Sequence, residues 1–146
     1  MSVAVDANVL VYASDESSAF HAKALDLVEG LARGTELLYL FWPVVLGYLI
    51  WGVVTRPAIF HRPLSVKART GNIDALSARP QTRSPGEGET FWPVHGATTA
   101  HLVVRGDLVP DAHHVALMRE NGVGTPWTHH RDLRQFEGSR VRDPFA

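Results

Sequence analysis

The sequence predicts an α/β fold with a mainly parallel sheet, and three observations support this prediction. Residues 3–5 and 37–41 are short apolar segments, typical of strands that are buried on both faces. Residues 21–32 instead repeat their apolar side chains at helical spacing. Segments of the two kinds alternate along the chain, and this alternation indicates βαβ units, whose strands run parallel.

Composition limits the possible functions. The chain has 146 residues and is expected to form one domain, 1–146, with an ordinary hydrophobic share of 45%. The absence of cysteine excludes disulfides and thiolate metal sites, and it fits a reducing compartment such as the cytoplasm. The net charge of −1 provides no global basic field, so any binding of nucleic acid must use local patches. Asp6 interrupts the apolar N-terminal segment too early for a signal peptide.

Leu37 to Val54 carries no charge and is about as long as a minimal membrane span. Pro43 and two glycines, Gly47 and Gly52, argue against a membrane helix. A buried strand followed by a buried helix with Pro43 in its first turn explains the same residues. We therefore expect no contact with a membrane.

Capping residues and turn signals place the other elements. Asn8 is a suitable N-cap for a helix that begins at Val9, and Ser65 for a helix that runs to about Ala78. Gln81–Thr90 is polar and rich in glycine and proline, and we expect a loop with room for a short strand. Further helices are expected at residues 43–55, 92–104 and 110–120, a helical turn at 131–136, and strands at 123–128 and, at the sheet edge, 140–145.

Three residues fit this scheme poorly. Gly52 lies inside a helix that is expected to be buried, and His114 lies near the apolar face of another helix. Pro126 lies in the middle of an expected strand, where it removes a hydrogen bond between strands. Natural sequences usually break such rules at functional sites, but here we interpret the three residues as drift.

Most of the 15 acidic residues belong to helix surfaces or loops, but four lie where a site could form. Asp6 ends the first strand, and open parallel sheets bind ligands at their carboxyl edge. Asp107 and Asp111 flank Leu-Val-Pro, and Pro110 at the first helical position would place Asp111 in the first turn. Asp132 follows the last long strand. Two alternatives stay open: Asp6 only caps its strand end, and Asp111 only complements the helix dipole.

Several segments occur in a specific order and spacing. They are Val5-Asp6-Ala7-Asn8-Val9-Leu10, Trp42-Pro43 with Val54 to Phe60, Asp107-Leu108-Val109-Pro110-Asp111-Ala112-His113, Thr128 to Phe136, and the ending Arg142-Asp143-Pro144-Phe145. No single segment is very specific, but the ordered set is. Together the segments resemble a PIN-domain ribonuclease, and most closely the VapC toxins of bacterial toxin–antitoxin pairs.

The resemblance implies a three-layer α/β/α PIN-like domain, in which clustered carboxylates hold Mg²⁺ or Mn²⁺ and activate water for attack on RNA. Asp6 matches the first family acid and Asp111 the principal late metal ligand, so both are the expected catalytic residues. Asn8 matches the residue that supports the first acid, and Asp107 a polar position that reaches the site through water. The resemblance also implies three partners: an RNA substrate, a VapB-like antitoxin and a second copy of the chain in a homodimer.

Two family acids are missing. One would fall near Gly47, and no acid occurs between Leu37 and Asp74. The other belongs to the family pattern Thr-x-Asp-Arg-Asp-Phe, whose first acid is His130 here. His130 is therefore a ligand for Mn²⁺ or Zn²⁺, a protonated contact to phosphate, or a surface residue without a role. Within this pattern Thr128 and Asp132 are expected in supporting positions. Because Asp6 and Asp111 alone offset roughly one divalent ion, we expect one weakly bound ion.

The leading hypothesis is a Mg²⁺-dependent endoribonuclease toxin. Arg56, Arg131 and Arg134 are the candidate RNA contacts, through phosphates rather than bases. The missing acids motivate an alternative, a catalytically impaired PIN-domain protein that still dimerises and binds its antitoxin. A third and weaker hypothesis is a nonspecific binder of single strands, which at this net charge should show little salt-dependent affinity.

Overall fold

The structure is a computed structural model that describes residues 1–54 and 64–146, with side chains 51–54 left out of the description. Four parallel strands form one sheet in the order β3-β2-β1-β4. The strands are β1 (Ser2–Val5), β2 (Leu37–Tyr39), β3 (Thr82–Arg83) and β4 (Pro126–Trp127). The predicted parallel α/β fold is confirmed, and the loop at residues 81–90 does contain a short strand.

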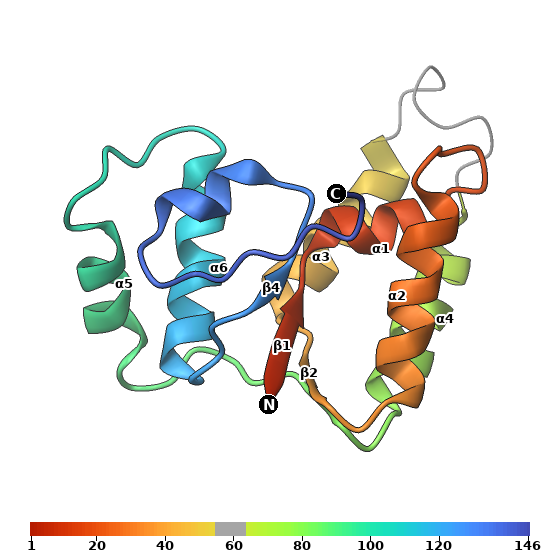
Figure 1. The fold of residues 1–146 in the computed structure, drawn as a ribbon, viewed down its shortest axis with the longest axis horizontal. Helices are drawn as coiled ribbons and strands as arrows, with labels where there is room; N and C mark the ends of the chain where they lie inside the picture. The colour runs from red at the N-terminus through yellow and green to blue at the C-terminus, as the bar shows by residue number, and fades with distance from the viewer. Residues whose placement is uncertain (55–63) are drawn as a thin grey trace.

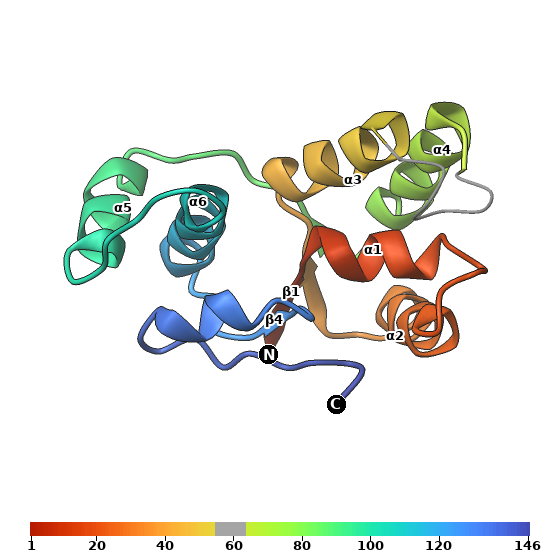
Figure 2. The same cartoon turned by 90° about the horizontal axis from the view of Figure 1, so that it is seen from above.

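Helices cover both faces of this sheet, which gives the three layers that the family resemblance implied. Four helices gather on one side, and two lie on the other (Figures 1 and 2). The first group is α1 (Ala7–Ala13), α2 (His21–Arg33), α3 (Trp42–Val54) and α4 (Val66–Ser77); the second is α5 (Phe91–Thr99) and α6 (Leu108–Glu120), with a 3₁₀ turn η1 (Arg131–Gln135) beside it.

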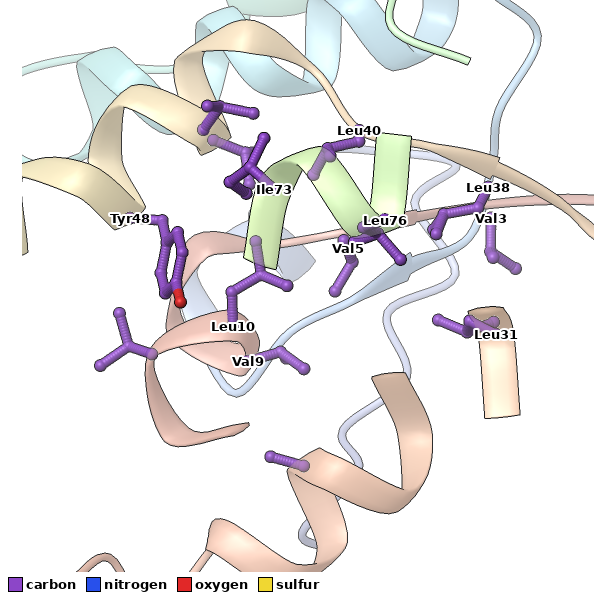
Figure 3. Packing of buried hydrophobic residues seen from close by; sticks show 14 residues of the cluster. Val3, Val5, Val9, Leu10, Leu31, Leu38, Leu40, Tyr48, Ile73 and Leu76 are labelled. Atoms are coloured by element: carbon purple, nitrogen blue, oxygen red, sulfur yellow. The ribbon is translucent and has the colours of Figure 1, made fainter. Parts of the chain in front are cut away.

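The alternation of side chains along the central strand explains this layering. Val3 and Val5 point into the larger core between the sheet and helices α1–α4 (Figure 3). Ala4 lies on the opposite face, where it packs with Phe41 and with Leu117 of α6. Val3, Ala4 and Val5 are at most 1% exposed. A strand that is buried on both faces has to be apolar throughout, as its sequence is.

The start of α1 differs from the prediction. Asp6, and not Asn8, is the N-cap: its carboxylate accepts a hydrogen bond from the backbone N–H of Ala7, where the helix begins. Aspartate is as good an N-cap as asparagine, and the extended backbone that Asp6 inherits from β1 is the conformation that an N-cap requires. The side chain of Asn8 is thereby free to make contacts elsewhere.

The start of α6 also differs, because the helix begins at Leu108 rather than at Pro110. Pro110 still loses no helical hydrogen bond, since the first four N–H groups of a helix have no partner within it. Asp111 lies in the first turn, as expected.

Pro126 is accommodated because the side of the residue that lacks an N–H faces away from β1. The carbonyls of Thr125 and Trp127 accept hydrogen bonds from β1, whereas the carbonyl of Pro126 accepts from Arg142 on the other side. In a parallel strand the N–H of a residue points to the same side as its carbonyl, so the ladder with β1 is complete. The expected last strand at 140–145 is reduced to an isolated parallel bridge between Trp127 and Arg142.

Within the described ranges, none of the helices has the length and apolar character needed to cross a membrane. The uncharged segment from Leu37 to Val54 divides into β2 and α3, as the sequence predicted. Gly52 lies within α3, at a position whose surroundings are outside the description.

Leu38→Ala tests the larger core. Leu38 is 1% exposed and lies in the middle of β2, so truncation leaves a cavity beside the sheet. We expect the free energy of unfolding, measured by urea denaturation, to fall by about 2–5 kcal/mol. Val103→Ala, at a residue that is 82% exposed, should change it by less than about 0.5 kcal/mol. Equal effects of the two substitutions would contradict the position of this core.

Candidate active site

Thr128 joins the carboxyl ends of β1 and β4. Its hydroxyl donates a hydrogen bond to Oδ2 of Asp6 at 2.8 Å, and it accepts from Nδ2 of Asn8 at 3.0 Å. A third bond, from the backbone N–H of His130 at 2.9 Å, uses the remaining acceptor capacity of the hydroxyl. Thr128 is 0% exposed, so water does not compete for these bonds. The hydroxyl therefore fixes both strand ends relative to each other.

Asn8 strengthens the same junction from the first turn of α1. Its Nδ2 lies 3.3 Å from Oδ2 of Asp6, and its Oδ1 accepts a hydrogen bond from the backbone N–H of His129 at 3.0 Å. Asp6 itself accepts from Ala7 N–H at 2.7 Å through its other oxygen. Both oxygens of the Asp6 carboxylate are thus held in place, by hydrogen bonds in which Ala7, Asn8 and Thr128 are the donors.

Three other side chains converge at this edge of the sheet. Asp111 comes from α6, whereas His130 and Asp132 come from the beginning of η1. Nδ1 of His130 lies 3.8 Å from Oδ2 of Asp111 and 3.5 Å from Oδ2 of Asp132. One ligand atom from each of the three residues lies within 4.8 Å of the other two. We call Asp111, His130 and Asp132 the Asp–His–Asp cluster.

The charges around Asp111 repel its negative form. Burial, and with it the carboxylates of Asp6, Asp132 and Asp107, raises the pKa of Asp111 to about 6, while His130 opposes the rise. The effect of Asp6 shows that its carboxylate and that of Asp111 share one electrostatic environment. Asp6 is nevertheless outside the Asp–His–Asp cluster. Asp6 thus lies near enough to Asp111 to raise its pKa, but it is not part of the three-residue group.

The residues present fit a divalent cation. Oδ2 of Asp111 is buried and has no hydrogen-bond partner among the described residues. Such an orphaned anionic oxygen is costly, and a bound cation would satisfy it. The cluster offers carboxylate oxygens, which are ordinary ligands for Mg²⁺ and Mn²⁺, and an imidazole nitrogen, which is an ordinary ligand for Zn²⁺.

Comparisons with known proteins show the family of this chain. Ribonuclease VapC48 of Mycobacterium tuberculosis is 49% identical over 146 residues, which cover 100% of this chain and 99% of the relative. The chain belongs to the VapC ribonuclease family. Ribonuclease VapC43 of the same species is 33% identical over 140 residues, 96% of this chain and 93% of that one. No family model matches the sequence.

Two solved structures share the fold at low sequence identity. VapBC2 from Rickettsia felis, bound to a DNA fragment from their promoter, superposes with a TM-score of 0.65 at 13% identity, covering 97% of this chain and 98% of that one. VapC20 of Mycobacterium tuberculosis, a toxin that cleaves the sarcin–ricin loop, gives a TM-score of 0.63 at 14% identity and covers 92% and 94%. The expected PIN-like architecture and VapC family are both confirmed.

Gly47 lies near the position where the family resemblance predicts an acid. A Cβ atom built on Gly47 would lie 3.4 Å from Cβ of Ala7, the residue that follows Asp6. The position therefore borders the start of α1, beside the candidate site, and glycine offers no ligand there.

His114, interpreted from the sequence as drift, lies beside the site in this VapC chain. It is 4% exposed and its ring packs edge-on against Phe41, with 5.7 Å between the ring centroids. Burial lowers the pKa of His114, and the nearby Asp6 opposes this effect only in part. The imidazole is therefore an uncharged component of the smaller core.

The remaining candidates have less defined positions. Asp107 is exposed at the N-cap of α6 and makes no capping hydrogen bond through its side chain. Arg131 and Arg134 are exposed on η1, close to the Asp–His–Asp cluster in the chain. Arg56 lies outside the described residues.

Sequence reasoning missed the role of His129. Its Nδ1 lies 3.0 Å from Oδ2 of Asp143, and its ring packs among Tyr12, Phe20 and Phe145. This contact ties the C-terminal segment to the first two helices. The adjacent histidines therefore face different partners, and only the motif Arg142-Asp143-Pro144-Phe145 hinted at the contact.

Asp111→Asn tests the charge repulsion in the metal-free protein. An aspartate ionises near pKa ~3.9 in an unfolded chain but at about 6 at position 111, so folding carries a cost of ionisation that grows from pH 4 to 6 and then stays constant. After allowance for solvent screening, the free energy of unfolding of the variant relative to wild type should rise by about 1–2 kcal/mol between pH 4 and 7. The measurement is urea denaturation with EDTA.

The exposed Asp74 of α4 provides the matched control for this prediction. Asp74→Asn should leave the pH dependence of unfolding close to that of the wild type. If Asp111→Asn and Asp74→Asn give the same pH dependence, Asp111 does not experience the repulsion described.

Proposed function

We propose that this VapC chain is a metal-dependent endoribonuclease toxin that hydrolyses RNA phosphodiester bonds. The Asp–His–Asp cluster beside Asp6 is the observation that carries the proposal, because clustered ligands at the carboxyl edge of a parallel sheet suit a cation and a phosphate. The name of the relative VapC48, a ribonuclease, supports the same activity. We also propose the cytoplasm as its compartment, on the basis of the cysteine-free sequence.

Each residue of the site has a proposed role. Asp111, His130 and Asp132 would hold a divalent ion, Mg²⁺ or Mn²⁺, with Asp6 as a further carboxylate at its edge. When bound, the ion supplies an activated water and offsets the charge of the scissile phosphate. Asp6 is held by Thr128 and Asn8, so the position of its carboxylate is fixed. Asp107, exposed near Asp111, contributes negative charge and reaches the site only through water.

Positive charge for the RNA backbone would come from the segment next to the cluster. Arg131 and Arg134 are exposed on η1, which also carries Asp132. Guanidinium groups bind phosphate oxygens in a bidentate manner, and such contacts position a strand without reading its sequence. Arg56 is proposed for the same role from the sequence pattern alone.

Asp6→Asn and Asp111→Asn should abolish cleavage. Each variant removes one negative charge from the site at nearly constant side-chain volume, and we expect a loss of at least about 100-fold in rate. Cleavage of a structured RNA is measured by gel electrophoresis with Mg²⁺ or Mn²⁺ present. Asp74→Asn, on the exposed face of α4, should cleave at the wild-type rate.

Two results would contradict this proposal. Cleavage by Asp6→Asn and Asp111→Asn at the wild-type rate would remove the site from the chemistry. A wild-type chain that cleaves no RNA with either ion would favour the alternative, an impaired member that only binds its antitoxin, for which Gly47 and His130 are the supporting observations.

The proposed antitoxin partner would have a groove available on the side of the sheet away from α6. The groove lies between α1, α2 and α4 and has a volume of about 1070 Å³. Leu10, Val28 and Leu76 provide apolar lining, and Asp15 and Glu29 provide negative charge. These features suit an amphipathic segment with basic residues, which is the kind of antitoxin segment that we propose.

We propose a homodimer that uses the exposed face of α3. Trp42, Leu46 and Ile50 occupy every fourth position and are 50%, 59% and 47% exposed. Trp42 and Leu46 also line an apolar hollow of about 480 Å³ together with Val109 of α6. Contiguous exposed apolar side chains of this kind mark association surfaces, and the three side chains on α3 carry no charge that would repel a second copy.

Leu46→Glu tests the dimer. A charge in the middle of the apolar stripe would be buried without a partner on association, so the dissociation constant should rise by at least about tenfold. Sedimentation velocity over a range of concentrations measures it. Val103→Glu places the same charge at an exposed residue outside the stripe and should leave association unchanged. A dimer that persists unchanged in Leu46→Glu would exclude this surface.

A further inference from the structure

We propose that His130 makes the site select a first-row transition-metal ion, such as Mn²⁺ or Zn²⁺, over Mg²⁺. The inference rests on the proposed function and makes it more specific, because it assigns the class of ion that the Asp–His–Asp cluster takes. It concerns the one position of the cluster where this chain departs from the acid of the family pattern.

The spacing of the three ligand atoms supports this assignment. Nδ1 of His130 lies 3.8 Å from Oδ2 of Asp111 and 3.5 Å from Oδ2 of Asp132, and both distances exceed those of ordinary hydrogen bonds. Two ligands about 2.1 Å from one ion, at a roughly tetrahedral angle, are about 3.4 Å apart. The imidazole is thus spaced from both carboxylates as ligands that share an ion are spaced.

Hydrogen bonds fix the backbone from which the imidazole of His130 extends. The N–H of His130 donates to the buried hydroxyl of Thr128, and the N–H of His129 donates to Oδ1 of Asn8. The ring of His129 is occupied by Asp143 at 3.0 Å. Of the two adjacent histidines, one therefore has a structural partner, and the other faces the acidic residues.

The chemistry of the donor set decides which ion fits. Mg²⁺ is a hard ion that requires oxygen ligands, whereas imidazole nitrogen suits Zn²⁺ and Ni²⁺, and the affinity of mixed nitrogen and oxygen sites rises from Mn²⁺ through Co²⁺ to Ni²⁺. Gly47 supplies no carboxylate near Asp6, and His130 replaces another, so the cluster has less negative charge with which to hold Mg²⁺. Two carboxylates and a neutral imidazole offset the charge of one divalent ion, which predicts a single ion.

An ion pair without metal is the competing explanation of the same geometry. A protonated His130 between Asp111 and Asp132 would also attract both carboxylates at these distances. The two explanations differ in what the replacement of His130 does. An ion pair predicts altered stability and an unchanged preference between ions, whereas a ligand predicts a changed preference.

Metal binding is measured directly, without RNA. Metal-free wild type is titrated calorimetrically with MnCl₂, ZnCl₂ and MgCl₂ in separate experiments at pH 7.5. We expect Mn²⁺ and Zn²⁺ to bind at least about tenfold more tightly than Mg²⁺. In NMR spectra, substoichiometric Mn²⁺ should broaden the imidazole resonances of His130 before those of His101, which is exposed and outside the cluster.

His130→Asp is the decisive variant, because it restores an oxygen ligand at the same position. The ratio of the Mg²⁺ to the Zn²⁺ dissociation constant should fall by about tenfold or more, the scale on which a single group alters metal affinity. His101→Asp makes the same change of side chain at an exposed position and should leave this ratio unchanged. Circular dichroism spectra show whether both variants remain folded. If His130→Asp does not fold, His130→Asn, which keeps the volume of the site, replaces it in the same titrations.

The outcomes separate this inference from the proposed nuclease activity. An unchanged ratio in His130→Asp, or Mn²⁺ broadening that spares His130, would overturn the inference even if RNA is cleaved. Binding of Mn²⁺ through His130 without any cleavage would support the inference and contradict the nuclease proposal. A wild-type chain that binds none of the three ions would overturn both.

Discussion

The hydroxyl of Thr128 is the constraint on which the site depends. In a parallel sheet the carboxyl ends of neighbouring strands lie at one edge, but this proximity alone does not orient the side chains that follow them. Thr128 Oγ1 provides the orientation, because it donates to Asp6 and accepts from Asn8 and from the backbone of His130. All three bonds are made by a fully buried group, for which the loss of a partner costs the most.

The negative charges that lie together at this junction repel one another. Asp6, Asp107 and Asp132 all raise the pKa of Asp111, and burial raises it most. An ionised carboxyl of this kind destabilises the metal-free protein at neutral pH. A bound cation would instead attract the carboxylate and stabilise the folded protein. His130 is the positive or neutral partner that the fold provides, and its position between two acids explains why replacement of a family acid by histidine leaves a coherent site rather than a gap.

Local rules predicted much of this structure. Buried strands and amphipathic helices were placed from periodicity, and the acids at positions 6 and 111 came from their place at a strand end and a helix start. The rules failed where two residues were equally suitable, as at the cap of α1, where Asp6 is used and Asn8 is freed to contact Thr128 and His129. They also failed at Pro126, which they marked as unsuitable for a strand. Pro126 is tolerated because its carbonyl faces Arg142 while the neighbouring carbonyls face β1, and local rules do not predict this pairing.

The sequence by itself determined the α/β alternation, the family, and the kinds of side chain available at the carboxyl edge. Only the tertiary structure decided which of them meet. His129 and His130 are neighbours with the same chemistry, yet one ring faces Asp143 and the other faces Asp111 and Asp132. The choice depends on hydrogen bonds that the backbone N–H groups of the two histidines donate to Asn8 and Thr128, which are separated by 120 residues in the chain. Periodicity and capping act over a few residues, whereas these contacts exist only once the sheet has brought the ends of β1 and β4 together.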